Sequence, residues 1–163
     1  MAANFRGYLD TLKKNDELTV ISKATDLRDI AALVPQSDKA LLFTNVRGYS
    51  MPVASGLLQS RNRLALGMGA AYEKIEAKLR TAMEHPIRPK RVTKAPVKEV
   101  IFTKSKVDLY QLPVPIFSIM DGGPMITAGV GSGGGSGGGV DAGLVRRMRQ
   151  GRENTALTYS TPH

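Results

Sequence analysis

The sequence predicts a mixed α/β (α+β) protein, in which a small N-terminal α/β domain is followed by a β-rich unit. Up to about residue 90, segments with helical periodicity alternate with short apolar strands. After Pro86 the apolar runs are short and separated by prolines and glycines. Residues 131–139 read GSGGGSGGG, the composition of a flexible linker. We therefore expect an α/β domain over 1–90, an extended connector over 91–111 and a β unit over 112–163.

In the N-terminal domain, polar capping residues and apolar periodicity mark where each element starts and stops. Asn4, Thr25 or Asp26, and Ser60 each precede a helical pattern and are suitable N-caps. Gly67 and Gly69 are expected to break the third helix. The fourth should bury a face formed by Ile75, Leu79 and Ala82 or Met83, and should stop at His85, before Pro86. Helices are predicted over 4–16, 25–34, 60–69 and 71–85, and strands over 17–22, 40–46 and 51–58.

The C-terminal half is predicted to be extended and rich in strands. Residues 97–103 and 125–130 have the β-branched, apolar composition of strands, and 107–118 is an extended segment restricted by Pro113 and Pro115. Residues 121–124, DGGP, predict a turn between these segments.

Residues 140–151 alternate as a strand, which places Arg146 on the same side as Leu144 and Met148. If that side faces inward, the guanidinium needs a partner or holds an anion such as a carboxylate. If this is an edge strand, its arginines extend into solvent instead. The alternation alone does not decide between the two arrangements.

The composition excludes several classes of function. The absence of cysteine rules out disulfides and thiolate chemistry, and neither a P-loop nor a nucleophile elbow is present. The glycines at 129, 131 and 134 match a dinucleotide pattern, but they lead into a strand and not a helix. The formal charge of +9 comes largely from basic clusters at 88–98 and 146–152. These clusters lack interleaved aromatics, so no nucleic-acid partner is predicted. No membrane-spanning or signal segment is seen, which predicts a cytoplasmic location and no membrane partner.

Three segments together point to a known family: residues 112–130, LPVPIFSIMDGGPMITAGV, residues 43–69 and residues 140–163. They resemble the UbiD family of prenylated-FMN-dependent carboxy-lyases, and 112–130 resembles the family's entry into its flavin-binding domain. Residues 43–69 are similar to the N-terminal domain of the family, and 140–163 to the next strands of the flavin domain. The family commonly carries Asn-x-x-x-x-Arg there, and this chain has Asp141 and Arg146 at the two positions.

The resemblance implies the first strands of a split β-barrel and non-oxidative decarboxylation of aromatic or α,β-unsaturated carboxylic acids. It implies prenylated FMN, supplied by a flavin prenyltransferase, together with Mn²⁺ and K⁺. Arg146 would be the catalytic residue, holding the substrate carboxylate. The implied cofactor contacts are Thr127, Gly143, Leu144 and Arg146, and the implied metal ligands are Asp141 and His163.

The family enzymes are several hundred residues longer, so the chain is interpreted as an engineered N-terminal fragment that is inactive by itself. The linker at 131–139 would replace a hairpin loop between two strands that follow one another in the sheet. Nine such residues span about 15–18 Å as a coil, which suits neighbouring strands. The alternative is a non-catalytic cofactor-binding or assembly module that needs a partner chain or forms an oligomer.

Overall fold

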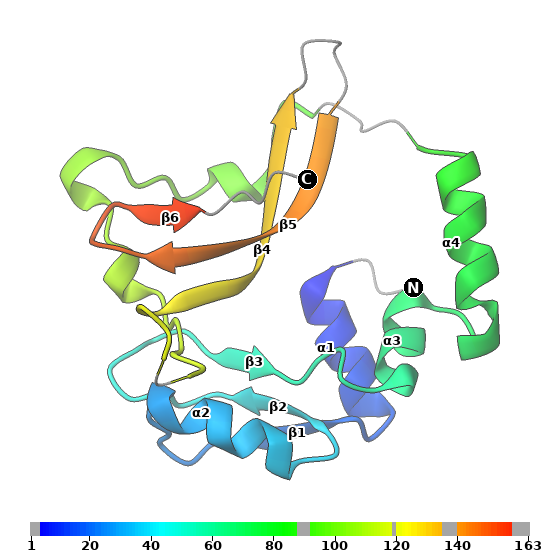
Figure 1. The fold of residues 1–163 in the computed structure, drawn as a ribbon, viewed down its shortest axis with the longest axis horizontal. Coiled ribbons are helices and arrows are strands. Elements are labelled where there is room, and N and C mark those ends of the chain that lie inside the picture. The colour runs from blue at the N-terminus through cyan, green and yellow to red at the C-terminus, as the bar shows by residue number, and fades with distance from the viewer. Residues whose placement is uncertain (1–3, 88–91, 119, 135–139, 158–163) are drawn as a thin grey trace.

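The computed structural model describes residues 4–87, 92–118, 120–134 and 140–157 and contains two three-stranded sheets (Figure 1). The first sheet has the order β1-β2-β3 and belongs to the N-terminal half. The second has the order β4-β5-β6 and belongs to the C-terminal half. The predicted mixed fold class is confirmed. Within the described residues, no helix has the length and apolar character needed to cross a membrane.

The first sheet is built around a parallel crossover. β1 (Leu18–Ile21) and β2 (Ala40–Phe43) pair in parallel and are connected through helix α2 (Leu27–Leu33). β3 (Val53–Ser55) then adds antiparallel to β2. A parallel pair needs such a crossover because its strands cannot be joined by a tight turn.

Helices cover both faces of this sheet because the side chains of β2 alternate. Leu41 and Phe43 pack with Ile30 of α2, together with Val34 and Val46. On the other face, Ala40 packs with Leu12 of α1 (Phe5–Lys14). The larger side chains of both clusters are fully or nearly fully buried.

The helix starts agree with the predicted caps, whereas one predicted break is wrong. Asn4 Oδ1 accepts a hydrogen bond from Gly7 N at 2.9 Å, and Asp26 and Ser60 cap α2 and α3 (Arg61–Met68) in the same way. Gly67 does not break α3. Its missing Cβ makes room for the Tyr8 ring, since a Cβ there would stand 3.2 Å from Tyr8 Cε2. The helix ends at Gly69, whose φ of 60° is left-handed.

Two predictions from apolar patterns differ from the structure, one in burial and one in secondary structure. In α4 (Ile75–Glu84), Ile75 is buried, but Leu79 is exposed and Met83 is 82% exposed. The expected strand over 97–103 is absent: a short 3₁₀ turn occupies Pro96–Lys98, and irregular chain follows it. A strand needs a hydrogen-bonded neighbour, and the described residues supply none beside this segment. Apolar side chains there are exposed: Val97, Val100, Ile101 and Phe102.

The second sheet is an antiparallel meander. β4 (Met125–Gly134) pairs with β5 (Val140–Arg149), and β5 pairs with β6 (Thr155–Leu157). β4 and β5 are strongly curved (Figure 1). They are consecutive neighbours, as predicted for the segments that the linker joins. The first four linker residues, 131–134, belong to β4, whereas 135–139 lie outside the described residues.

Tyr8 connects α1 to the chain around α3. Its hydroxyl lies 2.8 Å from the carbonyl oxygen of Leu57 and 3.0 Å from that of Arg63. Burial raises the pKa of this hydroxyl above its ordinary value. Because the pKa is raised in the folded state, the protonated Tyr8 hydroxyl stabilises the fold fully at neutral pH. This stabilisation is lost as the pH rises through the raised pKa.

Tyr8→Phe is therefore expected to lower the free energy of unfolding by about 1–2 kcal/mol at neutral pH. The difference from the unmodified chain should shrink at strongly alkaline pH, because the ionised hydroxyl no longer donates. Urea denaturation at neutral and at strongly alkaline pH measures this difference in the free energy of unfolding. Tyr72→Phe, whose hydroxyl has no partner within the described chain, is the control and should show no such pH-dependent difference. If Tyr8→Phe destabilised the chain equally at both pH values, the stabilising role assigned to the Tyr8 hydroxyl would be contradicted.

Candidate functional site

A β-bulge brings two of the predicted site residues together. Ile126 pairs with Arg147 and Gly129 pairs with Val145, so that two residues of β4, Thr127 and Ala128, oppose the single residue Arg146 of β5. An extra residue of this kind bends the strand and redirects its side chains, and bulges are frequent beside active sites. Thr127 and Arg146 therefore occupy neighbouring strands at the same level of the sheet.

Arg146 lies on the exposed side of β5. Leu144, two residues before it, is 84% exposed, and Arg146 has no hydrogen-bond or ion-pair partner in the described part of the chain. The better-packed side carries Val145, Arg147 and Arg149. The Arg146 side chain is exposed, as in the second predicted arrangement, but the premise of an edge strand is wrong, because β5 is the central strand of the sheet. Its arginines do not all extend into solvent, since Arg149 is bonded to the connector. An exposed guanidinium without a partner is available to an anion.

Other arginines of the same cluster have structural partners. The guanidinium of Arg149 lies 4.6 Å from the centre of the Tyr110 ring and donates to the carbonyl of Leu109 at 3.2 Å. Arg152 forms an ion pair with Asp108 at 2.7 Å. Both contacts attach the connector before the second sheet to the end of β5. This internal use weakens the case for nucleic-acid binding through the cluster.

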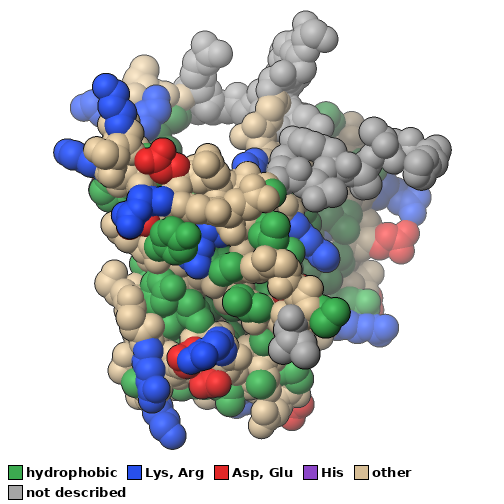
Figure 2. Space-filling view, turned by 60° about the vertical axis from the view of Figure 1, so that its left-hand side comes forward, with side chains coloured by type: hydrophobic (Ala, Val, Ile, Leu, Met, Phe, Trp, Pro, Cys, Tyr) green, Lys and Arg blue, Asp and Glu red, His purple; other side chains and the backbone are tan. Residues whose placement is uncertain are grey.

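An apolar groove adjoins the bulge. Its volume is about 320 Å³, and it is lined by residues 51–55 of the first sheet, by 113–115 with Phe117, and by 125–128 of β4. Phe117 and Ser118 are held in place by Asp121, whose Oδ2 accepts hydrogen bonds from both backbone N–H groups, at 3.2 and 3.0 Å. Figure 2 shows hydrophobic side chains gathered in the middle of one face, with lysine and arginine side chains above and below them.

These features fit a flat aromatic ring with polar edges. The groove offers apolar walls, and Thr127 contributes a hydroxyl that has no partner among the described residues. Arg146 lies on the next strand and is available to a negatively charged group. Binding sites for small molecules typically combine apolar walls with a few such polar groups. The donor set therefore fits the flavin that the resemblance implies.

Only one of the two predicted metal ligands, Asp141, lies in the described part of the chain, so the pair stays a prediction. Asp141 lies opposite Gly133 near the hairpin end of β5, five residues and about 16 Å along the strand from Arg146. His163 lies outside the described residues. The described residues contain no group of three His, Cys, Asp or Glu side chains able to hold a metal ion. Gly143 and Leu144 pair with Gly131 and Val130 of β4.

The sequence did not predict the part that the first sheet plays in this groove. Met51, Pro52 and Val53 lie more than 70 residues before Thr127, yet line the same groove. The attachment of Tyr110 to Arg149 was also missed. Neither contact has a local pattern, because each depends on how distant segments pack.

Gly129 is expected to be needed for the bulge. A Cβ at this position would stand 3.0 Å from the carbonyl oxygen of Val145, which belongs to the sheet backbone and cannot easily move. Gly129→Ala should therefore lower the free energy of unfolding by about 1–3 kcal/mol and weaken flavin binding. Gly133→Ala is the matched control, since a Cβ there meets nothing within 4 Å. Urea denaturation and flavin fluorescence measure the two effects, and equal behaviour of both variants would contradict the prediction.

Two family models together match most of the chain. Residues 9–83 match the 3-octaprenyl-4-hydroxybenzoate carboxy-lyase N-terminal domain, named UbiD_N. Residues 90–163 match the Rift-related domain of the same carboxy-lyase, named UbiD. The matches follow one another in the order in which the two sheets occur.

Known proteins are similar over most of the chain, which spans only part of their length. An uncharacterised protein in the cooM 5′ region of Rhodospirillum rubrum is 37% identical over 113 residues, 64% of this chain and 23% of that protein. A pyrrole-2-carboxylic acid decarboxylase of Pseudomonas aeruginosa is 33% identical over 142 residues, 75% of this chain and 28% of that enzyme. An evolved dimeric form of the UbiD-class enzyme HmfF from Pelotomaculum thermopropionicum, in complex with prFMN, superposes with a TM-score of 0.88 at 32% identity, covering 97% of this chain and 38% of that one.

Proposed function

The chain belongs to the UbiD family, and on this premise we propose that it is the first part of a prenylated-FMN-dependent decarboxylase of aromatic or α,β-unsaturated carboxylic acids. The observation that carries the proposal is the β4 bulge, which sets Thr127 opposite Arg146 beside an apolar groove. The prFMN complex of HmfF and the decarboxylase relative from P. aeruginosa support it.

In this proposal the exposed Arg146 is the residue that acts on the substrate. Its planar guanidinium can hold a carboxylate through two parallel hydrogen bonds and keep it oriented while the bond to the rest of the acid breaks. The apolar groove, which Arg146 does not line, would hold the apolar part of the cofactor or substrate beside it. When bound, the cofactor supplies an electron sink for the carbanion that remains after carbon dioxide has left.

Other residues of the chain would hold the cofactor and its metal. Thr127 offers a hydroxyl at the groove, and Gly143 and Leu144 offer backbone positions on β5 beside Arg146. Asp141 and His163 are proposed ligands of Mn²⁺, which prefers oxygen and imidazole donors. K⁺ and the flavin prenyltransferase are part of the same proposal, as is a cytoplasmic location.

The proposed domain division follows the predicted boundaries, with an α/β domain over 1–90, a connector over 91–111 and a partial flavin domain over 112–163. The proposal also keeps residues 131–139 as an artificial linker. Because the chain spans 28% of the P. aeruginosa enzyme and 38% of HmfF, we propose that it has no turnover by itself.

A non-catalytic assembly module is the second candidate. Apolar side chains at 97 and 100–102 are exposed, and among the described strands β4 pairs only with β5. Exposed edges and apolar segments of this kind bind other chains. Such a module would require a partner chain or an oligomer and would gain no activity from one.

A chimaera separates the two candidates. The matched part of the P. aeruginosa decarboxylase is replaced by this chain, and the chimaera is co-expressed with a flavin prenyltransferase. We expect it to release carbon dioxide from pyrrole-2-carboxylate, whereas the chain alone does not. A chimaera that folds and carries flavin but has no turnover would contradict the catalytic proposal and favour the module. Circular dichroism and the flavin absorbance establish folding and cofactor content.

A further inference from the structure

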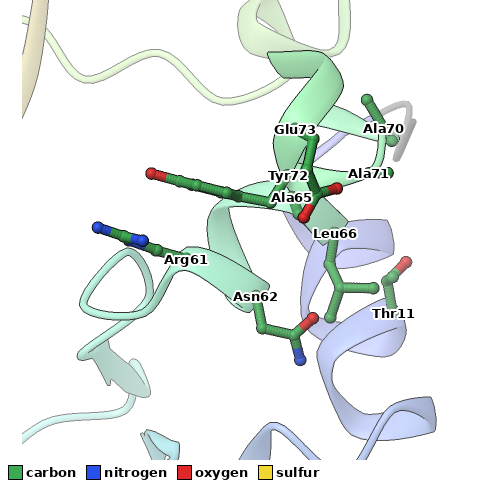
Figure 3. Close-up of a pocket in the computed structure, with 10 residues that line it drawn as sticks. Thr11, Arg61, Asn62, Ala65, Leu66, Ala70, Ala71, Tyr72 and Glu73 are labelled. Carbon is green, nitrogen blue, oxygen red and sulfur yellow. The ribbon is translucent and has the colours of Figure 1, made fainter. Parts of the chain in front are cut away.

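A second cavity of the described residues lies away from the bulge and its groove. It has a volume of about 880 Å³ and opens between α1, α3 and the start of the α4 region (Figure 3). Its floor is apolar, formed by Ala65 and Leu66 together with the chain that follows α3. Thr11, Asn62 and Glu73 supply polar groups to its walls.

Three side chains that line this cavity, those of Thr11, Asn62 and Glu73, offer hydrogen-bond acceptors. Asn62 donates one N–H of its amide to Glu17 Oε1, and its amide oxygen is left to accept. Thr11 donates its hydroxyl proton to the carbonyl of Gly7 at 2.8 Å, so that its oxygen is also left to accept. Glu73 is exposed and has no partner within the described chain, and an ionised carboxylate only accepts.

Figure 3 shows that two of these acceptors converge. The Glu73 carboxylate points from one wall toward the side where the Asn62 amide oxygen lies, and Leu66 is another residue of the lining. Arg61 extends away from this space and lies over the Tyr72 ring, 5.0 Å from its centre. Its cation is therefore directed to the rim and does not fill the space between the acceptors.

We propose that this cavity binds a primary ammonium group carried on a short apolar stem. The ammonium has three donors and no acceptor, which matches the converging acceptors, and the stem would lie on Ala65 and Leu66. The ligand is a free alkylamine or the lysine side chain of another protein, two sources with the same chemistry. The site is independent of the decarboxylase proposal and uses none of its residues.

An NMR titration of the ¹⁵N-labelled chain tests the proposal. n-Butylammonium chloride is expected to cause saturable shifts in the amides of Leu66 and Ala70 to Glu73, whereas n-butanol, its uncharged match, causes weaker ones. Nα-acetyl-lysine N-methylamide separates the sources: tighter binding than n-butylammonium indicates a lysine side chain, and equal or weaker binding indicates a free amine. Absence of saturable shifts, or equal binding of n-butanol, would overturn the proposal.

Glu73→Gln keeps the shape of the side chain and removes its charge. It should weaken n-butylammonium binding about tenfold, the loss expected for one charge-assisted hydrogen bond. Glu76→Gln is the matched control, because this exposed glutamate pairs with Arg80 and does not line the cavity. An equal loss in both variants would show that only the overall charge matters and would overturn the site.

Discussion

Arg63→Met is expected to lower the free energy of unfolding by about 3 kcal/mol. Arg63 is 2% exposed, and its Nη1 donates to Glu17 Oε2 at 3.1 Å and to the carbonyl oxygen of Asp38 at 2.6 Å. Methionine fills a similar volume, but it leaves the Asp38 carbonyl without this donor and the Glu17 carboxylate with one partner fewer. Leaving one member of a buried pair without its partner costs far more than the pair itself contributes.

The expected loss is at the lower end of the usual range for two reasons. Arg63 Nε is buried without a hydrogen-bond partner in the described chain, so part of the desolvation cost is already present. Glu17 also keeps its hydrogen bond from Asn62. Urea denaturation measures the change. Arg80→Met removes an exposed ion pair with Glu76 and should cost about 0.5 kcal/mol or less. Similar losses in the two variants would contradict this account of Arg63.

Arg146→Gln is expected to lower kcat of the chimaera at least about 100-fold while flavin stays bound. Glutamine can still form a hydrogen bond but loses the charge and the paired donors that fit a carboxylate. Since Arg146 is exposed and has no described partner, the change should leave the fold intact. Steady-state kinetics with pyrrole-2-carboxylate and the flavin absorbance together measure the two effects.

Arg147→Gln is the matched control for this prediction. It makes the same substitution on the neighbouring residue of β5, which occupies the other side of the strand and pairs with Ile126. We expect nearly unchanged kcat for this variant. Equal losses for Arg146→Gln and Arg147→Gln would point to net charge or sheet stability and would contradict the role proposed for Arg146.

Most of the N-terminal elements could be predicted from the sequence because their signals are local. Asn4, Asp26 and Ser60 each cap a helix through a hydrogen bond two or three residues away. The strand over 97–103 was wrongly predicted, because β-branched composition says nothing about whether a neighbouring strand is available. Gly67 was misjudged for a similar reason, since its place in α3 depends on Tyr8, 59 residues earlier.

The candidate site was predicted only as a set of positions. The resemblance pointed to Thr127 and Arg146, but the bulge that sets one against the other depends on the pairing register. The apolar groove needs Met51 to Ser55, which no local pattern connects to β4. Asp141 and His163 stay predictions, as does the artificial origin of the linker.

The absorbance spectrum of the chain co-expressed with a flavin prenyltransferase tests the central claim most directly. If the β4 bulge forms the cofactor site, a flavin band should co-elute with the folded chain on gel filtration. Gly129→Ala should reduce that band, and Gly133→Ala should retain it. A folded but colourless chain, or a band that Gly129→Ala leaves unchanged, would contradict the claim that the cofactor binds at this bulge.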